Sequence, residues 1–473
     1  MRTLNRVLAP TLLLTLLAGC AALPEAPPPK RNVILFLGDG MGISTITAAR
    51  IFAGQAQGGS GEEFSLSFER FPNVALIKTY NTDAQVPDSA GTMSAIMTGT
   101  KTRAGVISVA PVVARNDCAG SLQNPMPTLL EMAEDAGYAT GVISTARITH
   151  ATPAATYSHV PNRNWESDAQ LPENAVAEGC RDIARQLVEF DHGDGIDVIL
   201  GGGRAMFLAS TEADPEYPNA TGIRRDGADL AQTWQAGASG RAYVWNRAGF
   251  DALDPATSGQ VLGLFEPSHM QYEADRARDP GGEPSLAEMT RFAIERLQRN
   301  GSGYFLMIEG GRIDHAHHEG NAYRALVDTG AMADAVSVAE SLTSADDTLI
   351  IVTADHSHTL TINGYPGRGN PILGKVATEP GNYTLDAQGH PYTTLSYANG
   401  PGYQAEIPDL TNVDTEDPDY LQIATLPMAG ETHGGEDVAA FASGRNADQV
   451  HGVMEQNRLF DAMYQTLFPG EAR

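Results

Sequence analysis

The stretch that decides the fold is Asn32-Val33-Ile34-Leu35-Phe36-Leu37-Gly38-Asp39-Gly40. Val33–Leu37 is an apolar run of strand length that ends at glycine, which is typical of a buried strand in an α/β sheet. Two later runs repeat the pattern: Tyr304–Ile308 leads into Glu309-Gly310-Gly311, and Thr348–Val352 leads into Thr353-Ala354-Asp355-His356. Each run therefore predicts a strand that ends beside an acidic side chain.

Other apolar runs extend the same sheet. These further strands are predicted at Val74–Thr79, Ala139–Ser144 and Asp197–Leu200, and helical patterns lie between the runs at Pro127–Ala136, Ala175–Phe190, Ser285–Arg299 and Asn321–Leu342. Because strands and helices alternate, we expect an α/β fold with a large, mostly parallel central sheet and helices on both faces. From about Tyr365 to Leu426 the helical period disappears, which predicts an inserted loop-rich subdomain.

The composition describes a large, acidic globular protein. Of 473 residues, 42% are hydrophobic and 19% charged, which excludes disordered, collagen-like and coiled-coil chains. Lys and Arg number 31 against 58 Asp and Glu, so the formal net charge is −27. Such a chain repels phosphate backbones, and we expect no binding to nucleic acid.

Residues 1–19 have the pattern of an export signal. Arg2 and Arg6 precede the apolar run Val7–Leu17, which is too short to span a bilayer but long enough for a signal core. Leu17-Ala18-Gly19-Cys20 resembles a bacterial lipoprotein cleavage site, and an ordinary signal peptide cut slightly later is the alternative. We expect a periplasmic or cell-envelope protein with a lipid anchor at Cys20, a Pro-rich tether at residues 20–31 and a folded domain at residues 32–473.

The remaining two cysteines are expected to form a disulfide. If Cys20 carries lipid, only Cys118 and Cys180 are left, and an exported compartment oxidises such pairs. The alternative is two buried free thiols.

Residues just beyond the strands are candidates for the functional site, because ligands of open α/β sheets bind at the carboxyl ends of the strands. One acid there could be a helix cap, but capping explains poorly why Asp39, Glu309 and Asp355 all stand beside Gly or His. Gly38-Asp39-Gly40-Met41-Gly42 also does not fit a dinucleotide-binding loop, because its spacing is wrong and its Asp would repel a pyrophosphate.

Histidines cluster with carboxylates along the second half of the chain. Asp314 and His318 are four residues apart, on one face of a helix, Asp355 and His356 are adjacent, and His433 lies in Glu431-Thr432-His433-Gly434-Gly435. Nitrogen and oxygen ligands without thiolate indicate a catalytic zinc site rather than a structural one.

Two residues are candidates for handling an anionic substrate. Ser89, in Pro87-Asp88-Ser89-Ala90-Gly91-Thr92, precedes a helical pattern whose N-terminus would favour an anion. Arg163 stands in the polar stretch Val160-Pro161-Asn162-Arg163-Asn164-Trp165, and a guanidinium matches two phosphate oxygens. A helix N-cap and a surface arginine remain the alternatives.

Together these segments resemble the alkaline phosphatase family, from Asn32 to about Tyr464. The resemblance is carried by six motifs in order, which are Phe36-Leu37-Gly38-Asp39-Gly40-Met41-Gly42, Asp88-Ser89-Ala90-Gly91-Thr92, Thr149-His150-Ala151-Thr152-Pro153-Ala154, Glu309-Gly310-Gly311-Arg312-Ile313-Asp314-His315, Thr353-Ala354-Asp355-His356 and Glu431-Thr432-His433-Gly434-Gly435.

The resemblance implies hydrolysis of phosphate monoesters with broad specificity, through a phosphoserine intermediate. It implies Ser89 as the nucleophile, Arg163 as the phosphate clamp, one Zn²⁺ held by Asp314, His318 and His433, a second Zn²⁺ held by Asp39, Asp355 and His356, and one Mg²⁺ held by Asp39, Thr152 and Glu309. Two metal ions side by side suit an in-line displacement at phosphorus.

His150 and His315 place the chain with a branch of the family that includes the animal enzymes and some bacterial ones, where the best-known bacterial form has Asp and Lys. A neutral His near the magnesium predicts weaker Mg²⁺ binding. The branch also implies pairing of Cys118 with Cys180, a crown at about residues 365–426 that helps to form a homodimer, and a Ca²⁺ site. The residues matching that site are Glu216, Phe265 through its carbonyl, Glu266 and Glu283, and plain surface acids are the alternative.

Three other functions compete with this interpretation. A sulfatase nucleophile sits in C/S-x-P-x-R, whereas Ser89-Ala90-Gly91-Thr92-Met93 lacks both Pro and Arg. A phosphodiesterase of this fold usually has Thr at the nucleophile and lacks the magnesium triad. A non-catalytic surface lipoprotein that binds phosphate or divalent metal is the alternative from another class.

Overall fold

The computed structural model describes residues 31–470. The predicted export signal, Cys20 and residues 20–30 of the predicted tether lie outside the described residues. Between residues 31 and 470, no helix combines the length and the apolar character needed to cross a membrane.

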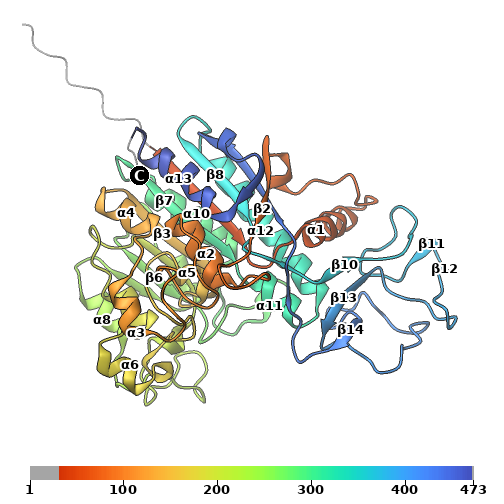
Figure 1. The fold of residues 1–473 in the computed structure, drawn as a ribbon, viewed down its shortest axis with the longest axis horizontal. Helices are drawn as coiled ribbons and strands as arrows, with labels where there is room; N and C mark the ends of the chain where they lie inside the picture. Colours follow the sequence, from red (N-terminus) through yellow and green to blue (C-terminus); the bar gives the residue numbers. More distant parts are fainter. Residues whose placement is uncertain (1–30, 471–473) are drawn as a thin grey trace, which may run out of the picture.

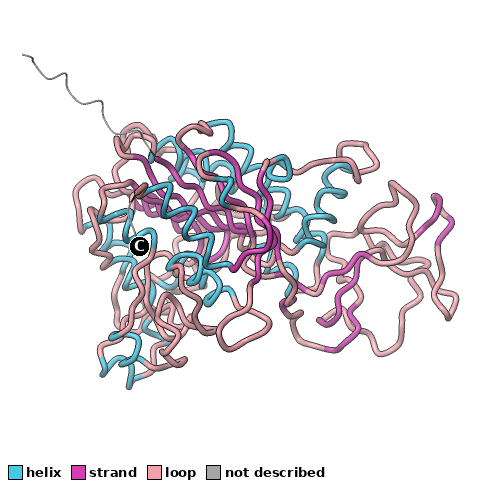
Figure 2. Tube along the Cα trace, turned by 45° about the horizontal axis from the view of Figure 1, so that its top comes forward, coloured by secondary structure: helices cyan, strands magenta, loops and turns pink. Residues whose placement is uncertain are grey.

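A ten-stranded sheet forms the centre of the molecule (Figures 1 and 2), with the order β17-β2-β16-β8-β1-β7-β3-β4-β6-β5. Its strands are β1 (Arg31–Gly38), β2 (Asn73–Lys78), β3 (Ala139–Arg147), β4 (Val198–Gly202), β5 (Ala242–Val244), β6 (Val261–Leu264), β7 (Gly303–Gly310), β8 (Thr348–Thr353), β16 (Val438–Gly444) and β17 (Gly452–Glu455). Neighbouring strands run parallel except at β16, which is antiparallel to β2 and β8. The predicted large, mostly parallel sheet is confirmed.

Helices cover both faces of this sheet (Figure 2). They are α1 (Ile43–Ala56), α2 (Ser89–Thr98), α3 (Cys118–Gln123), α4 (Leu129–Asp135), α5 (Ala151–Ala154), α6 (Glu173–Glu178), α7 (Ile183–Val188), α8 (Leu230–Ala236), α9 (Arg247–Asp251), α10 (Leu286–Leu297), α11 (Arg312–His318), α12 (Ala322–Leu342) and α13 (Leu459–Leu467). Helices α1, α10 and α11 pack around α12 on one face, whereas α2, α4 and α13 pack together on the other. Val33–Leu37 of β1 is fully buried between these layers, as a parallel strand covered on both faces should be.

The six predicted strands all form, but one predicted helix is wrong. The periodic stretch Ala175–Phe190 folds as two helices, α6 and α7. Helix α6 ends at Gly179, whose φ of 95° is a left-handed conformation that glycine adopts without strain. A new helix then begins at Ile183, capped by the side chain of Asp182.

Cys118 and Cys180 are joined by a disulfide, with their Cα atoms 6.0 Å apart, which confirms the predicted pairing. The bond links the start of α3 to the break between α6 and α7. The two sulfurs are buried with Trp165 and Ala175 in a small apolar cluster separate from the main core.

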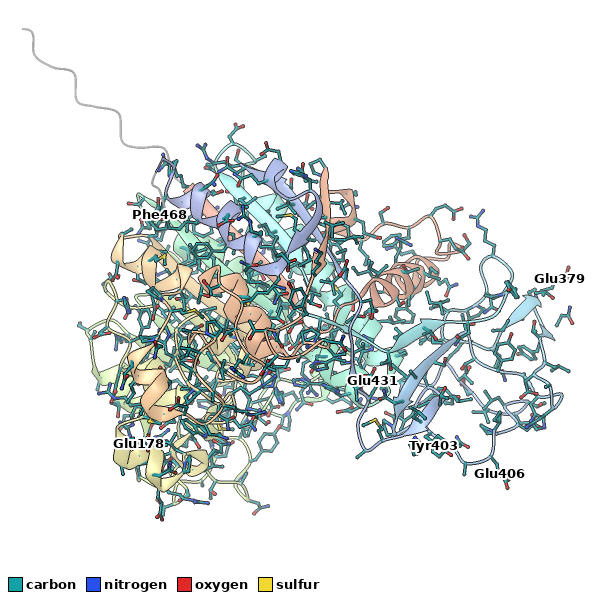
Figure 3. All side chains as sticks on the ribbon, viewed as in Figure 1. Glu178, Glu379, Tyr403, Glu406, Glu431 and Phe468 are labelled. Atoms are coloured by element: carbon teal, nitrogen blue, oxygen red, sulfur yellow. A yellow bond between two sulfur atoms is a disulfide. The ribbon has the colours of Figure 1, made fainter. Side chains whose placement is uncertain are left out.

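Residues 360–427 project from the body of the molecule (Figure 1). All of them are described, and they form only short strands and loops. The strands are β10 (Leu360–Ile362), β11 (Ala377–Glu379), β12 (Asn382–Tyr383), β13 (Leu395–Gly400) and β14 (Ala424–Pro427). At the base of this segment, β9 (Ser357–His358) pairs with β15 (His433–Gly434), so that the chain enters and leaves the segment at one place. Figure 3 labels Glu431 at this base, and Glu379, Tyr403 and Glu406 farther out.

Candidate active site

The carboxyl ends of three adjacent strands bring three acids together. β1 lies between β7 and β8 in the sheet, and Leu37 is in register with both Glu309 and Thr353. Asp39, Glu309 and Asp355 therefore meet at one edge, where each is fully buried. The expected convergence of acidic residues after the strands is observed.

A second group, from α11 and β15, lies against these acids. His318 Nε2 is 3.3 Å from Asp314 Oδ1 and 3.2 Å from His433 Nε2, and His433 Nε2 is 3.5 Å from Asp314 Oδ1. The i, i+4 spacing of Asp314 and His318 on a helix therefore places both side chains at one point, as the sequence predicted. His433 reaches the same point from across the β9–β15 pair.

The histidines are oriented so that their lone pairs face the carboxylates. The Nδ1 hydrogens of His318 and His433 point at the carbonyl oxygens of Glu431 and Pro87, and that of His356 points at the carbonyl of Ser357. A carbonyl oxygen can only accept, so in the neutral ring Nε2 is left without a hydrogen. This arrangement is the usual one for histidines that bind metal through Nε2.

His356 completes a group with Asp39 and Asp355. Its Nε2 lies 3.3 Å from Asp39 Oδ1 and 3.4 Å from Asp355 Oδ2, and one donor atom from each of the three residues falls within 4.8 Å of the others. The three residues predicted to hold the second metal are thus brought together.

Donor atoms without partners mark the places where cations fit. Both carboxylate oxygens of Asp39, together with Asp355 Oδ2, Glu309 Oε1 and Thr152 Oγ1, are buried and have no hydrogen-bond partner among the described residues. Unpaired polar groups are costly to bury. Divalent cations would satisfy all of them, so the residues present fit the metals that the family implies.

The electrostatics of the acids also favour a bound cation. Burial and the neighbouring carboxylates raise the pKa of Asp39 well above its ordinary value, and burial raises the pKa of Glu309 to about 7 despite a hydrogen bond from Ser144. Asp314 differs, because His318, His358 and His433 overcome its burial and hold its pKa well below the ordinary value. A positive ion beside Asp39 and Glu309 would favour their charged forms.

The third predicted metal position gathers one additional residue. His150 joins Asp39 and Glu309, with one donor atom from each within 4.8 Å of the others. Burial and the charge of Arg163 hold the pKa of His150 well below its ordinary value, and burial lowers the pKa of His315 to about 3. Both rings are therefore neutral at physiological pH, and their centroids lie 5.5 Å apart.

His358 and Glu431 belong to the site, although we did not assign them a role from the sequence. His358 Nε2 donates to Asp314 Oδ1 at 2.8 Å, and its Nδ1 donates to Glu431 Oε2. Burial opposes a charge on this ring, but the two carboxylates raise the pKa of His358 to about 9. The signal that could have revealed it is the alternation His356-Ser357-His358, which puts both rings on one side of an extended chain.

Gly40 makes room for His358. A Cβ atom at position 40 would lie 2.3 Å from His358 Nε2, and the φ of 68° is left-handed. Glycine at position 40 therefore allows the chain after β1 to lie close to His358 at the end of β9.

Ser89 stands at the first position of α2, and Asp88 rather than Ser89 is the helix N-cap. Asp88 Oδ1 accepts from the backbone N–H of Gly91 at 3.0 Å. The Ser89 hydroxyl is thus free of capping and lies 3.2 Å from His356 Nε2, at a helix N-terminus that favours negative charge.

Arg163 faces the same space. Its Nη1 donates to Asp88 Oδ2 at 3.1 Å, and its Nη2 donates to His150 Nε2 at 3.1 Å. The predicted clamp is therefore held by Asp88, the residue before Ser89, and by His150, rather than extending into solvent as a surface arginine would.

A separate cluster of carboxylates contains two of the four residues expected at a calcium site. Glu216 and Glu266 lie with Asp279, and one oxygen from each is within 4.8 Å of the others. Glu283 lies outside this group, where its Oε1 accepts from the backbone N–H of Gln271 at 2.9 Å. Asp279, four residues before Glu283, was not among the residues expected at this site. Phe265 is buried in the core.

Comparison with known proteins agrees with this geometry. A model of the alkaline phosphatase family matches residues 30–468. The tissue-nonspecific alkaline phosphatase of Gallus gallus is 48% identical over 443 residues, which are 92% of this chain and 83% of that protein. The alkaline phosphatase of Gadus morhua is 44% identical over 451 residues, covering 94% of this chain and 93% of that one.

Solved structures show the same fold. The alkaline phosphatase from the Antarctic bacterium TAB5 superposes with a TM-score of 0.63 at 22% identity, over 93% of this chain and 99% of that one. The Thermus thermophilus alkaline phosphatase superposes with a TM-score of 0.65 at 23% identity, over 96% of this chain and 95% of that one. On the family match and the identity to its relatives, this chain belongs to the alkaline phosphatase family.

Proposed function

We propose that this chain hydrolyses phosphate monoesters, releasing inorganic phosphate and an alcohol through a phosphoserine intermediate at Ser89. The observation that carries the proposal is the position of the Ser89 hydroxyl, which lies 3.2 Å from His356 Nε2 of the buried acid cluster, at the start of a helix whose N-cap, Asp88, also holds the Arg163 guanidinium. The relatives named alkaline phosphatase support the same substrate class.

In the proposed reaction, Ser89 Oγ forms the bond to phosphorus while the ester bond to the alcohol breaks. The serine proton leaves toward solvent, and the alcohol oxygen takes a proton as it departs. Water then attacks the phosphoserine and restores the hydroxyl. Arg163 donates two hydrogen bonds to the non-reacting phosphate oxygens, and the N-terminal amides of α2 favour the same negative charge.

The donor sets support two Zn²⁺ ions and one Mg²⁺ ion. Asp314, His318 and His433 would hold one zinc, and Asp39, Asp355 and His356 the other. Magnesium, which prefers oxygen, would take Asp39, Glu309 and Thr152. When bound, these cations supply the positive charge that offsets the phosphate dianion and lowers the pKa of hydroxyl groups they contact.

We also propose a Ca²⁺ ion at the cluster of Glu216, Glu266 and Asp279, with the Phe265 carbonyl as a further ligand. Burial raises the pKa of Glu266 to about 7, and Asp279 Oδ2 has no hydrogen-bond partner among the described residues. Oxygen-only donors of this kind suit calcium.

Export, lipid anchoring at Cys20 and a homodimer complete the proposal. The disulfide Cys118–Cys180 supports an oxidising compartment such as the periplasm. Mass spectrometry of the mature N-terminus would test the lipid, and light scattering of the purified protein would test the dimer. A mature N-terminus beyond residue 20 that carries no lipid would contradict the anchor. The mass of a single chain would contradict the dimer.

The central experiment compares Ser89→Ala with the wild type on an aryl phosphate, an aryl sulfate and a phosphodiester. We expect phosphate hydrolysis to fall by about a thousandfold or more, since the nucleophile is lost. Ser341→Ala, at an exposed serine of α12, is the matched control. Acid quenching should trap one phosphoryl group on the Ser89 peptide of the wild type.

Two outcomes would overturn this function. If Ser89→Ala is as fast as the wild type, the reaction does not pass through a phosphoserine at Ser89. A wild type that turns over sulfate or diester faster than monoester would change the substrate class.

A further inference from the structure

Three histidine rings meet at the edge of the candidate active site, and one of them has no role in the proposed function. His269 lies in the loop after β6, whereas His150 follows β3 and His315 belongs to α11. The centroid of the His269 ring is 3.9 Å from that of His315 and 5.4 Å from that of His150. His269 therefore contacts both of the neutral histidines near the third metal position.

The loop that carries His269 is tied to β3. The backbone N–H of Met270 donates to the carbonyl oxygen of Thr145 at 3.0 Å. The His269 ring itself meets Arg147, whose backbone N–H lies 3.2 Å from Nδ1 and whose Nη1 lies 2.5 Å from Nε2. Because an arginine can only donate, a protonated ring would meet a donor at each nitrogen, so the ring is neutral. The main chain and the side chain of Arg147 thus hold this ring in one orientation.

Arg147 is anchored in turn by Glu166. Nε and Nη2 of Arg147 donate to the two oxygens of this carboxylate at 2.8 and 2.7 Å. Glu166 is buried, and its Oε2 also accepts from the hydroxyl of Thr149, the residue before His150, at 2.7 Å. A bidentate pair of this kind fixes the plane of the guanidinium. Glu166 therefore fixes both the arginine that holds His269 and the segment that carries His150.

The ring of His150 suits the water around a magnesium ion better than the ion itself. One of its nitrogens is within 4.8 Å of donor atoms of Asp39 and Glu309, where magnesium is proposed. Its Nε2 accepts from Arg163, so in the neutral ring the buried Nδ1 carries the hydrogen. A nitrogen that carries hydrogen cannot bind a metal, but it can donate to a water on the metal, and Mg²⁺ usually keeps several waters.

Ring packing orients His315. Its Nδ1 is buried and has no hydrogen-bond partner among the described residues. The rings of His269 and His150 lie against it, with centroids 3.9 and 5.5 Å away. Rings in such contact restrict each other's position and tilt. Removal of the His269 ring would therefore loosen His315 and His150 together.

We propose that His269 is a positioning residue for the magnesium of the third metal position. Its ring does not bind the ion but holds the rings of His150 and His315, whose Nδ1 atoms form hydrogen bonds with the waters that Mg²⁺ keeps. Because these rings are neutral, they favour the ion through hydrogen bonds rather than charge, and hydrogen bonds depend on orientation. The inference rests on the magnesium of the proposed function, and it adds a residue outside the set of donors.

The test titrates Mg²⁺ by calorimetry into the zinc-loaded enzyme after removal of its magnesium. It compares the wild type with His269→Ala, His269→Phe and His451→Ala. His269 is partly exposed in a loop, so its variants should fold, and His451, an exposed histidine directly before β17, is the matched control. We expect His269→Ala to bind Mg²⁺ about tenfold more weakly, since residues that support metal ligands typically contribute at least this much. His269→Phe keeps a ring at this place and should stay within about twofold of the wild type.

Zinc content, measured by elemental analysis of the same samples, distinguishes positioning from a general structural role. We expect equal zinc in all four proteins, because the ring contacts of His269 are with His150 and His315. The proposal is overturned if the wild type binds no Mg²⁺, if it binds Mg²⁺ no more tightly than His269→Ala, or if zinc is lost together with magnesium. It is also overturned if His269→Phe is as weak as His269→Ala.

Hydrolysis of an aryl phosphate by the wild type is measured separately. If the wild type binds Mg²⁺ but does not hydrolyse the ester, the proposed function fails. The comparison of magnesium affinities then still decides whether His269 has the positioning role.

Discussion

Asp88 and Arg163 are joined by a hydrogen bond of 3.1 Å, and the same Asp88 carboxylate caps the helix that begins at Ser89. One side chain therefore positions both the proposed nucleophile and the proposed phosphate clamp. The two carboxylate oxygens have different partners. Oδ1 accepts from the backbone amides of Gly91 and Gly105, and Oδ2 accepts from the guanidinium.

Asp88→Asn separates these roles. The amide oxygen can still accept from Gly91, but the charge that holds Arg163 is gone, so we expect the inhibition constant of inorganic phosphate to rise by about 2- to 10-fold. The melting temperature should change little, whereas Asp88→Ala should lower it by removing the cap. An unchanged inhibition constant in Asp88→Asn would show that Arg163 needs no partner to bind phosphate.

Magnesium should activate this enzyme reversibly. His150 brings a neutral ring to Asp39 and Glu309, where a carboxylate would add negative charge and oxygen ligands. After removal of Mg²⁺, activity should fall and return on adding it, and His150→Asp should need less Mg²⁺ for half-maximal activity. Activity that does not depend on Mg²⁺ in the wild type would contradict this prediction.

His358→Gln should loosen the metal position at Asp314. His358 donates to Asp314 Oδ1 and is itself held by Glu431, so it fixes the orientation of that carboxylate. Loss of such a supporting residue typically costs 10- to 100-fold in metal affinity. The free Zn²⁺ concentration needed for half-maximal activity should rise by that factor, and full activity should return at saturating zinc. His451→Asn, at an exposed histidine directly before β17, is the control whose zinc dependence should not change.

Glu134 should make the fold less stable in alkali. Burial and the charges of Asp197 and Asp194 raise its pKa to about 8, although Thr140 donates a hydrogen bond to it. The folded state then binds the proton more tightly than the unfolded state, so stability falls as the pH rises from about 4.5 to about 8. The melting temperature of Glu134→Gln should exceed that of the wild type at pH 9 but not at pH 4. Glu178→Gln, at an exposed acid, should match the wild type at both pH values.

Removal of the disulfide should be costly. Cys118 and Cys180 are 62 residues apart, and closing a loop of that length stabilises by roughly 4 kcal/mol in the chain-entropy model. Cys118→Ser should lower the free energy of unfolding in urea by about this amount, as should reduction of the wild type. If reduction leaves the unfolding midpoint unchanged, the bond does not contribute to stability.

Much of the sheet and most of the site could be predicted from sequence, because both depend on local patterns. Short apolar runs such as Val33–Leu37 identify buried strands, and the residues after them converge since parallel strands end at one edge. Strands β5 and β17 were not predicted because they are short and partly exposed. Strand β16 was not predicted because its apolar residues are mainly alanine, which has no strand preference.

The residues that were missed depend on contacts between distant segments. His358 is recognised only once β9 and β15 pair, which brings Glu431 to its Nδ1. Asp279 is recognised only once the fold brings it to Glu216 and Glu266. The Ala175–Phe190 pattern is broken at Gly179, whose left-handed conformation ends α6.

The position of β1 has a consequence for how the protein is made. It is the first strand of the described chain, yet its neighbours β7 and β8 come from residues 303–310 and 348–353. A ribosome would therefore release most of the polypeptide before Val33–Leu37 could find a partner, and long-range pairing of this kind is slow. Strand β1 must therefore stay unpaired until residues 303–353 have been made, whereas β3, β4, β6 and β5 are neighbours in the sheet and can pair with one another earlier.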